Sequence, residues 1–459
     1  MTTNKNFIEF FNECEKMLPV DTWTYKKIHL WPILKWQIFN SNVKHYSPSI
    51  FIRLKQIAQL VRILFYPTNC RFKPQASDFV FYSQGQRTHF EDKWLDPLLD
   101  PIKDKYVNAR KSVISIESQP ELKIPQYYPA FHLRIIEAIL YAIAQIVYLK
   151  PVAIPEYAKL KATATKHGFT INDDILISLS RTIKGIYLIA QFYSSLLKII
   201  KPQRVYLTCY YSMAGTALLY AAKQLRIEAV DVQHGSNMSN FAYIGWKKIP
   251  EGGYNTIPDT FWNWSKFDVA EIKNNNSKKF LTYHKPFLGG LPWANQWLED
   301  NAATNKYDKK VAAICADAPL KILVLTRPSF YGEESSWKML TDLINKAPPQ
   351  WFWLLRKHPA YNKLDACFDQ VVGYKNVNVD EASDLPLYAL FRNCDLIITT
   401  SSNASALEAY FFNKQTIFLS KVAEEESGDL LRKINCKTIE TPKELLVFLK
   451  AFQAAKQTK

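Results

Sequence analysis

The sequence predicts an α/β protein with two Rossmann-like, doubly wound domains that face a cleft, preceded by an extra helical N-terminal segment. Two observations support this fold class. Short apolar runs alternate with long helical patterns along most of the chain, which indicates crossover connections in a parallel sheet. The chain also has 459 residues, which is too long for one ordinary core and suits two domains of roughly 200 residues each.

The first half of the chain begins with helical patterns and continues with strands. Residues 1 to about 75 indicate mainly helix and end in an irregular stretch that contains proline. Short apolar runs predict buried strands, at 79–83, 112–116, 204–208 and 229–233. Helical patterns lie between them, at 131–149, 182–200 and 212–225.

The second half repeats this rhythm. Strands are predicted at 321–326, 351–355, 396–399 and 416–419, and helices at 334–346, 384–393 and 403–412. Two polar segments place a domain junction between 270 and 305. We therefore divide the chain into a helical segment (1–75), a first Rossmann-like domain (76–280), a second (281–440) and a C-terminal helix (441–459) that we expect to cross back to the first domain, as the last helix does in many two-Rossmann enzymes.

The chain is basic, with a formal net charge of +16 and a pI near 9.2. Such a surface attracts nucleic acid, anionic lipid headgroups or phosphorylated small molecules. Residues 55–66 have the pattern of a basic amphipathic helix, typical either of a membrane surface or of an ordinary solvated helix. Aromatic residues make up 14% of the chain, which suits sugar binding as well as core packing.

Cysteines and apolar segments bear on the compartment. The seven cysteines are scattered without a Cys-x-x-Cys pair, which argues against a disulfide framework or a zinc site. No apolar stretch of a secretory signal follows the N-terminus. The most apolar stretch, 131–149, contains His132, Arg134 and Glu137, so a core helix is favoured over a membrane span. We expect a cytoplasmic protein, with peripheral contact to the inner membrane left open.

Polar residues follow the predicted strands of the second domain, where ligands of open parallel sheets bind. They suit a phosphate, because cationic donors and helix N-termini both bind anions. Solvated loops and simple helix capping are the alternative interpretations. The candidate nucleotide-sugar-binding residues are Arg327, Ser329, Arg356, Lys357, His358, Pro359, Ser401, Ser402, Ser405 and Glu408.

In the first domain, the segment 231–237 ends a predicted strand and contains a glycine that permits close backbone approach. Asp231 and His234 are the candidate catalytic residues, although His234 also suits a satisfied core histidine and Asp231 a structural carboxylate. An earlier strand end points polar groups toward the same cleft. Its acceptor-side candidates are Gln86, Arg87, His89, Glu91 and Asp92.

These segments resemble a known family. Residues 231–235 (Asp-Val-Gln-His-Gly), 356–359 (Arg-Lys-His-Pro) and 401–409 (Ser-Ser-Asn-Ala-Ser-Ala-Leu-Glu-Ala) are similar to motifs of bacterial capsule and lipopolysaccharide glycosyltransferases of GT-B fold, which include Kdo and sialic acid transferases. The resemblance covers roughly 200–420 and also includes 258–265 and 287–292. It implies that His358, Ser401 and Ser402 contact the donor phosphate. The acidic base motif of that family is absent here, which leaves the general base open.

The resemblance implies a glycosyltransferase that moves a sugar from a nucleotide-sugar donor, either CMP-Kdo-like, CMP-sialic-acid-like or a UDP-sugar, to a surface polysaccharide or lipid-linked acceptor. Residues 76–280 would then be the acceptor domain and 281–440 the nucleotide-sugar domain. No Asp-x-Asp pair stands at a predicted strand end, so we expect no metal and no cofactor, with basic groups stabilising the departing phosphate. The alternatives are a nucleotide-sugar 2-epimerase, a glycerol-phosphate transferase, or a basic nucleic-acid-binding protein. No nucleic-acid-binding motif is present, so nucleic acid is not an expected partner.

Overall fold

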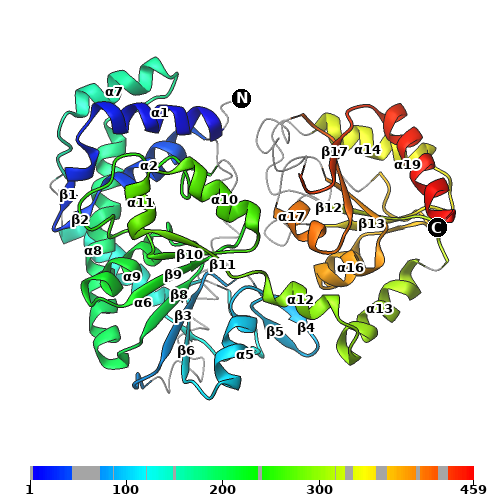
Figure 1. Cartoon of the computed structure of the whole chain (residues 1–459), viewed down its shortest axis with the longest axis horizontal. Helices are drawn as coiled ribbons and strands as arrows, with labels where there is room; N and C mark the ends of the chain where they lie inside the picture. The colour runs from blue at the N-terminus through cyan, green and yellow to red at the C-terminus, as the bar shows by residue number, and fades with distance from the viewer. Residues whose placement is uncertain are drawn as a thin grey trace. The chain divides into compact units, whose positions relative to one another are not determined.

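The computed structural model describes residues 4–43, 73–85, 87–119, 121–147, 151–235, 240–315, 317–325, 334–357, 370–399, 404–421 and 433–458. The chain divides into two compact units. Unit 1 comprises residues 1–88 and 92–291, and unit 2 comprises 89–91 and 292–459. Each unit has its own parallel sheet with helices packed on it (Figure 1). The basic segment 55–66 lies outside the described residues.

The sheet of unit 1 has seven strands, and all of its pairings are parallel. In chain order the strands are β3 (Phe79–Ser83), β6 (Val113–Glu117), β7 (Phe131–His132), β8 (Arg204–Leu207), β9 (Glu228–Val232), β10 (Thr260–Asn263) and β11 (Lys285–Leu288). They lie side by side in the order β11-β10-β9-β8-β3-β6-β7. The chain therefore winds outward from β3 in one direction and from β8 in the other. The winding reverses between these two strands, where doubly wound sheets bind ligands.

The helices of unit 1 are α5 (Asp100–Asn108), α6 (Arg134–Val147), α7 (Tyr157–Lys166), α8 (Asp174–Ile200), α9 (Met213–Gln224), α10 (Lys266–Asn275) and α11 (Lys278–Tyr283). Helix α8 is the one described helix that is long and apolar enough to span a membrane. Half of its most apolar window is buried inside the protein, and α8 packs against α6 and α9. It is therefore a core helix of unit 1.

The N-terminal segment is part of the same unit. It forms α1 (Asn4–Met17), a 3-10 turn η1 (Val20–Thr22), the two short strands β1 (Thr24–Tyr25) and β2 (Ile28–His29), and α2 (Trp31–Asn42). Its aromatic side chains lie in the core cluster of unit 1. A buried ion pair, 2.7 Å from Lys35 Nζ to Glu15 Oε1, joins α2 to α1. Glu15 also accepts hydrogen bonds from the backbone N–H groups of Lys247 and Lys248, so the end of α1 is tied to the loop 246–248.

Unit 2 repeats the winding of unit 1. Its strands are β12 (Lys321–Leu325), β13 (Phe352–Arg356), β14 (Val377–Asn378), β15 (Leu396–Thr399), β16 (Gln415–Phe418) and β17 (Cys436–Thr438). They are parallel, in the order β14-β13-β12-β15-β16-β17, so the switch lies between β12 and β15. Its helices are α12 (Pro292–Leu298), α13 (Ala302–Cys315), α14 (Glu334–Lys346), α15 (Asp380–Asp384), α16 (Leu387–Asn393), α17 (Ala404–Phe411) and α19 (Pro442–Gln457).

The C-terminal helix α19 differs from the expectation that it crosses back to the first domain. It packs against α14, and Leu445 and Leu449 are buried in the core of unit 2. Lys456 forms an ion pair with Asp395 at 2.8 Å, and Gln453 accepts a hydrogen bond from the Trp351 indole at 2.7 Å. The apolar face of α19 is thus satisfied within unit 2.

The predicted fold class is confirmed, because both sheets are parallel, doubly wound and covered by helices. All eight strands predicted from apolar runs are present, and each begins and ends within one residue of its predicted bounds. The predicted helix at 131–149 begins with β7, so the helix itself starts at Arg134. The described strands that the sequence did not predict are mostly short or lie at the edges, namely β1, β2, β4 (Thr88–Phe90), β5 (Lys93–Leu95), β7, β10, β11, β14 and β17.

Candidate functional site

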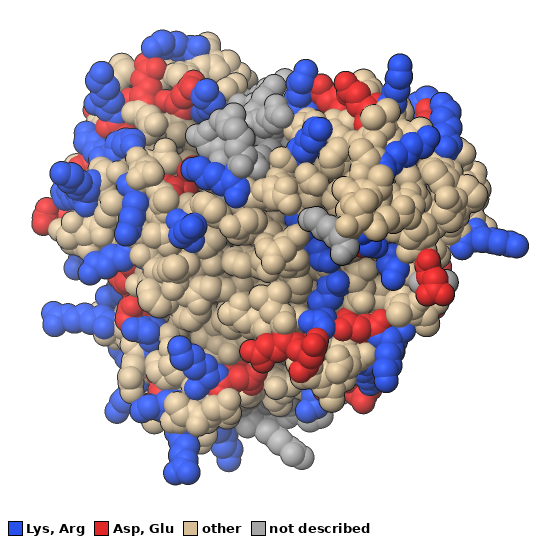
Figure 2. All heavy atoms as spheres, turned by 45° about the vertical axis from the view of Figure 1, so that its right-hand side comes forward, with Lys and Arg blue, Asp and Glu red and all other residues tan. Residues whose placement is uncertain are grey.

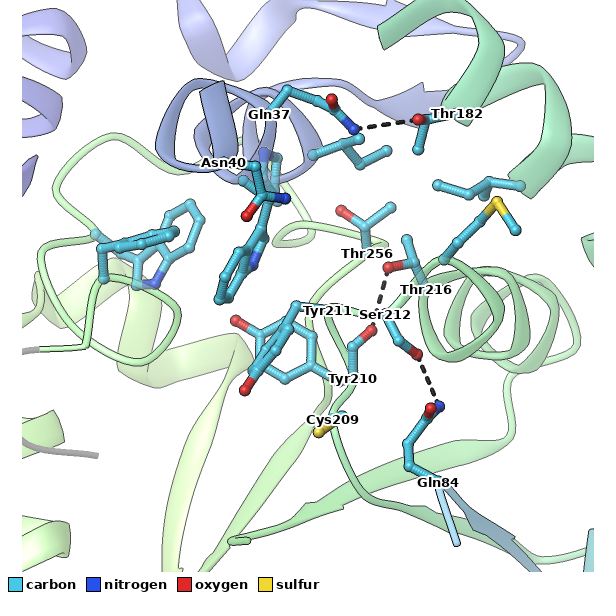
Figure 3. A pocket seen from close by; sticks show the side chains of 17 residues that line it. Gln37, Asn40, Gln84, Thr182, Cys209, Tyr210, Tyr211, Ser212, Thr216 and Thr256 are labelled. Atoms are coloured by element: carbon cyan, nitrogen blue, oxygen red, sulfur yellow. Dashed lines mark hydrogen bonds between the residues drawn. The ribbon is translucent and has the colours of Figure 1, made fainter. Parts of the chain in front are cut away.

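A cavity of about 430 Å³ lies at the carboxyl ends of β3 and β8, where the winding of the first sheet reverses (Figure 3). Its volume falls in the range of small-molecule sites. The lining comes from three parts of unit 1: the turn after β8, the N-terminal helix α2, and the α8 helix and nearby loops. The lining residues are Pro32, Ile33, Trp36, Gln37, Asn40, Gln84, Thr182, Ile186, Cys209, Tyr210, Tyr211, Ser212, Met213, Thr216, Phe241, Trp246 and Thr256.

The turn 208–212 carries the chain from β8 into α9. Cys209 has a φ of +56°, a left-handed conformation that non-glycine residues adopt at a cost. Ser212 caps α9 by accepting a hydrogen bond from the backbone of Gly215. A Cβ atom at Gly215 would lie 2.8 Å from Ser212 Oγ and 2.9 Å from the Cys209 carbonyl oxygen, so only glycine fits there. This tight turn presents the side chains from Cys209 to Ser212 at the cavity.

Helix α2 supplies the opposite wall. The Trp36 ring stacks on the Tyr211 ring with centroids 4.2 Å apart and planes 24° apart. Gln37 is fixed at both ends of its amide, since it donates to Thr182 at 3.1 Å and accepts from Ser178 at 2.8 Å. The ion pair of Lys35 with Glu15 holds the helix in place, and the Lys35 ammonium lies 3.5 Å from the centre of the Trp246 ring. The N-terminal segment is thus a built part of the cavity wall.

None of the seventeen lining residues is acidic, basic or a histidine. The polar groups of their side chains are amides, hydroxyls, indole N–H groups and one thiol, and aromatic rings supply much of the rest. Two threonines on this wall differ. The Thr216 hydroxyl donates to the Tyr210 carbonyl at 3.1 Å. Thr256 is only 1% exposed, and its buried hydroxyl has no hydrogen-bond partner among the described residues.

Asp231 lies beneath this turn rather than in the cavity lining. It is 1% exposed, and its carboxyl oxygens accept hydrogen bonds from the Tyr210 backbone N–H and the Tyr243 hydroxyl, each at 3.1 Å. Burial raises the pKa of the Asp231 carboxyl to about 8, and the two hydrogen bonds oppose this shift only in part. The group is therefore mostly protonated at pH 7. Its position suits a residue that orients Tyr210 at the cavity wall.

His234 lies beside the cavity wall. Its Nε2 atom is 2.9 Å from the Tyr211 hydroxyl and 2.9 Å from the Cys209 thiol, and both of those residues line the cavity. Burial lowers the pKa of the His234 imidazole to about 4, so the ring is neutral at pH 7. Burial also raises the pKa of the Cys209 thiol to about 12, so the thiol keeps its proton. The imidazole is thus a neutral hydrogen-bond partner of two wall residues.

The loop that carries His234 is fixed by Gln233. The Gln233 side-chain amide donates to the Gly235 carbonyl at 2.8 Å and to Asp268 at 2.9 Å. Its amide oxygen accepts from the backbone N–H of Trp264 at 2.8 Å. These three bonds tie the end of β9 to the end of β10 and the start of α10. They hold the loop that carries His234 against the rest of unit 1.

The described acceptor-side candidates from the sequence are not among the lining residues of this cavity. Gln86 lies outside the described residues. The Arg87 guanidinium is buried, pairs with Glu117 at 2.9 Å, and donates to the Trp94 carbonyl at 3.0 Å. It therefore holds β5 against β6.

His89 and Glu91 belong to unit 2 by their packing, whereas Asp92 is exposed at the start of the next stretch of unit 1. Between His89 and Glu91, the Phe90 ring packs against Trp293, Trp297 and Tyr307. The backbone N–H of Glu91 donates to the Tyr307 hydroxyl at 2.7 Å. The turn between β4 and β5 is thus anchored on α12 and α13.

In unit 2, the described candidates meet at the carboxyl end of the second sheet. Arg356 ends β13 and donates to the carbonyl groups of Ala382 and Leu385. Burial lowers the pKa of Arg356 to about 10, against the opposing charge of Glu408, and the guanidinium stays charged at pH 7. Lys357 Nζ lies 3.7 Å from the exposed Asp380 carboxylate.

Glu408, on α17, lies near enough to Arg356 for the two charges to influence each other. It accepts a hydrogen bond from the Tyr388 hydroxyl at 2.7 Å. Burial raises the pKa of Glu408, whereas hydrogen bonds from Tyr388 and Ser405 and the charge of Arg356 oppose the rise. The other six candidates lie outside the described residues, namely Arg327, Ser329, His358, Pro359, Ser401 and Ser402. Within the described ranges, no three His, Cys, Asp or Glu side chains are grouped as metal ligands would be.

The sequence did not point to the cavity. Its turn, 208–212, directly follows a predicted strand, so the rule that strand ends carry ligands would have included Cys209, Tyr211 and Ser212. Trp36 and Thr256 had no such signal. Trp36 lies more than 170 residues before the turn in the sequence and Thr256 about 45 residues after it, and only the fold brings them to the cavity.

Comparison with known proteins identifies the fold. No protein-family model matches this chain, and no curated protein matches it by sequence. The UDP-GlcNAc 2-epimerase of Methanocaldococcus jannaschii, in complex with UDP-GlcNAc and UDP, matches 82% of this chain and 92% of its own at 12% identity and a TM-score of 0.50. That of Neisseria meningitidis, bound to UDP-GlcNAc, matches 83% and 92% at 12% identity and a TM-score of 0.50.

These two similarities show that the chain has the two-domain α/β architecture of GT-B type. The glycosyltransferase of kitacinnamycin also matches 83% of this chain and 91% of its own, at 10% identity and a TM-score of 0.39. At identities this low, the shared feature is the fold, and function has to be argued from the site.

Proposed function

We propose that this chain is a glycosyltransferase that moves a sugar from a nucleotide-sugar donor to a glycan or glycolipid acceptor. One observation carries the proposal: unit 1 has a cavity of its own at the switch point of its sheet, and none of its described lining residues is charged. A group transfer needs a place for a second substrate, whereas an epimerase needs only its nucleotide sugar. The cavity supplies that place in a unit separate from the cationic strand ends of unit 2.

The donor side of the proposal rests on unit 2. Arg356 ends β13 and Lys357 follows it, and Ser401 and Ser402 precede α17, which begins at Ala404. In a doubly wound sheet, strand ends and helix N-termini face the same edge, where they stabilise a nucleotide phosphate. We assign Arg356 a positioning role, because its donors are taken by Ala382 and Leu385, and we assign phosphate binding to Lys357, His358 and the two serines.

For the chemical step, we propose that His234 accepts the proton of the acceptor hydroxyl through Tyr211. The acceptor O–H would give its proton to Tyr211 Oη while the Tyr211 proton moves to His234 Nε2. The 2.9 Å spacing between Tyr211 Oη and His234 Nε2 is within hydrogen-bonding reach. Burial lowers the pKa of the imidazole to about 4, so the ring holds the proton only transiently, while the acceptor oxygen attacks the sugar. Asp231 then acts on the wall through Tyr210 rather than as the base. This assignment needs no metal ligand.

The test is to incubate the protein with CMP-, UDP-, GDP- and CDP-sugars and watch both binding and products. The matching nucleotide at one hundred times its dissociation constant should stabilise the protein by about 2.7 kcal/mol in a thermal-shift measurement. The matching donor with a glycan acceptor should then give a longer glycan and free nucleotide. Failure of all four nucleotides to bind would contradict the proposal.

The second candidate is a nucleotide-sugar 2-epimerase, because the two best-matched folds reported above belong to UDP-GlcNAc 2-epimerases. An epimerase would convert its sugar without an acceptor, so product analysis with the acceptor omitted separates the two activities. Nucleic-acid binding is less favoured. On the face shown in Figure 2, Lys and Arg side chains are scattered among Asp and Glu rather than gathered in one stripe, as a nucleic-acid groove would require.

A further inference from the structure

We propose that the unit 1 cavity is selective for an uncharged sugar residue, with the Thr256 hydroxyl as a specificity-determining donor or acceptor and Trp36 and Tyr211 as an aromatic wall. The role of this sugar as the acceptor rests on the proposed function. The preference for a neutral sugar rests only on the residues that line the cavity.

The lining combines hydrogen-bonding groups with aromatic rings. Amide and hydroxyl groups come from Gln37, Asn40, Gln84, Ser212 and Thr256, and aromatic rings face the same space. Sugars present hydroxyl groups around a ring whose C–H faces are apolar, and this combination matches both kinds of wall. Gln37, Gln84 and Ser212 already have hydrogen-bond partners within the protein. A purely apolar chain would still leave the Thr256 hydroxyl without a partner, at the cost of one buried polar group.

The described lining is uncharged. The protein carries +16 overall, yet none of the lining residues that the structure describes is charged. A carboxylate or phosphate buried against these residues would lose its hydration without meeting a lysine, arginine or histidine among them. Burying such an unpaired charge is strongly unfavourable. The cavity therefore rejects acidic and phosphorylated sugars, and the binding of charged groups is left to unit 2.

The Thr256 hydroxyl is unpartnered among the described residues. Buried polar groups in proteins are almost always hydrogen-bonded, so a buried hydroxyl without a protein partner is available to a water molecule or to a ligand group. Figure 3 shows this side chain toward the middle of the cavity, between Asn40 and Thr216. The neighbouring Thr216 has the same side chain but gives its hydrogen bond to the Tyr210 carbonyl. Thr256 has no such use among the described residues.

The experiment uses the full chain without donor. Saturation-transfer NMR measures the binding of the methyl glycosides of glucose, galactose, mannose and N-acetylglucosamine, with methyl glucuronide as the charged counterpart. We expect at least one neutral glycoside to bind and the glucuronide not to bind. Thr256→Val should weaken the neutral glycoside about fivefold, as expected for one neutral hydrogen bond. Thr256→Ser, which keeps the hydroxyl, should bind like the wild type.

Thermal unfolding gives a second readout that a merely structural threonine would not produce. Thr256→Val removes an unpaired hydroxyl and should keep or raise the melting temperature. Thr216→Val breaks a made hydrogen bond and should lower it. The proposal is overturned if no neutral glycoside shows saturation transfer, if the glucuronide binds as tightly as the neutral glycosides, or if Thr256→Val binds like the wild type.

Nucleotide binding, measured by calorimetry on the same preparations, separates this inference from the proposed function. Glycoside binding that is retained in a protein that binds none of the four nucleotides would support the cavity assignment and contradict the glycosyltransferase. Nucleotide binding and transfer without any selectivity for neutral glycosides would contradict the cavity assignment alone.

Discussion

In unit 1, the two strands beside the switch point lead into neutral and aromatic residues, including Gln84, Tyr211 and Ser212. In unit 2, the strand β13 leads into the cations Arg356 and Lys357. The two sheets nevertheless wind in the same way from their central strands. This difference teaches that the winding of a doubly wound sheet sets where a ligand binds, whereas the few residues after each strand set which chemistry it has.

The two units also differ in how their strand ends are supported. The turn after β8 rests on Asp231, Gln233 and the N-terminal helix α2, which are held by buried hydrogen bonds and one buried ion pair. The described edge of unit 2 rests on Arg356 and its two carbonyl partners. In unit 1, the N-terminal helix α2 thus forms part of the cavity wall.

The largest expected effect is on the chemical step in unit 1. His234→Ala should lower turnover by about 10²–10⁴-fold, the usual contribution of a general base, while nucleotide affinity stays nearly unchanged. Steady-state kinetics and calorimetry on the same preparation measure both quantities. Tyr211→Phe should show a large part of the same loss. Turnover near the wild-type rate in a folded His234→Ala variant would remove this residue from the reaction.

The next effect is the pH dependence of stability at Asp231. Its folded-state pKa of about 8 lies above the value of an unfolded Asp, near 3.9, so the folded protein holds a proton that the unfolded chain releases between these values. Stability therefore falls as the pH rises from 5 to 8. Asparagine cannot ionise, so the Asp231→Asn variant should lack this decrease in the free energy of unfolding, which is about a few kcal/mol in the wild type. Urea unfolding at several pH values measures the difference. Parallel curves for the two proteins would mean that Asp231 is ionised at neutral pH and is available as a base.

A smaller effect is expected at the donor side. His358→Ala should lower transfer at least roughly tenfold, because it removes a donor to the leaving phosphate. Glycoside binding in the unit 1 cavity, measured as above, is the matched control and should not change. If transfer is unchanged while the protein stays folded, the similarity of 356–359 to the His-Pro motif has no functional meaning here.

The smallest expected effect is at the helix N-terminus of the second sheet. Ser402→Ala should weaken nucleotide binding by about 1 kcal/mol, the scale of one neutral hydrogen bond. Calorimetry with the matching nucleotide measures this change. An unchanged affinity in the double variant of Ser401 and Ser402 would contradict the assignment.

The sequence was sufficient for the central strands. Strands such as β3 and β15 are buried along their whole length, so they appear as uninterrupted apolar runs between turn residues. Strands β7 and β14 have two residues each, too few to form a pattern. The edge strand β11 contains a proline and is largely exposed, which hides it from the same test.

The candidate site was less accessible to sequence reasoning. Asp231 and His234 were found because Asp231 lies near the end of a predicted strand and His234 directly follows it, but their partners Tyr243 and Tyr211 come from other elements. Arg87 has the composition of a ligand-binding residue, and only the fold shows that Glu117 uses its charge. Whether a threonine such as Thr256 has a partner is decided entirely by tertiary contacts.

The central claim is that one chain binds a phosphorylated donor in unit 2 and a neutral sugar in unit 1, and joins them. The most direct measurement is mass spectrometry of reactions that contain the matching nucleotide sugar, with a neutral glycan acceptor present or omitted. The account predicts that a glycan longer by one sugar appears with release of nucleotide, only when the acceptor is present, and equally with EDTA. Conversion of the donor sugar into its epimer without acceptor, and no elongated glycan with it, would contradict the account.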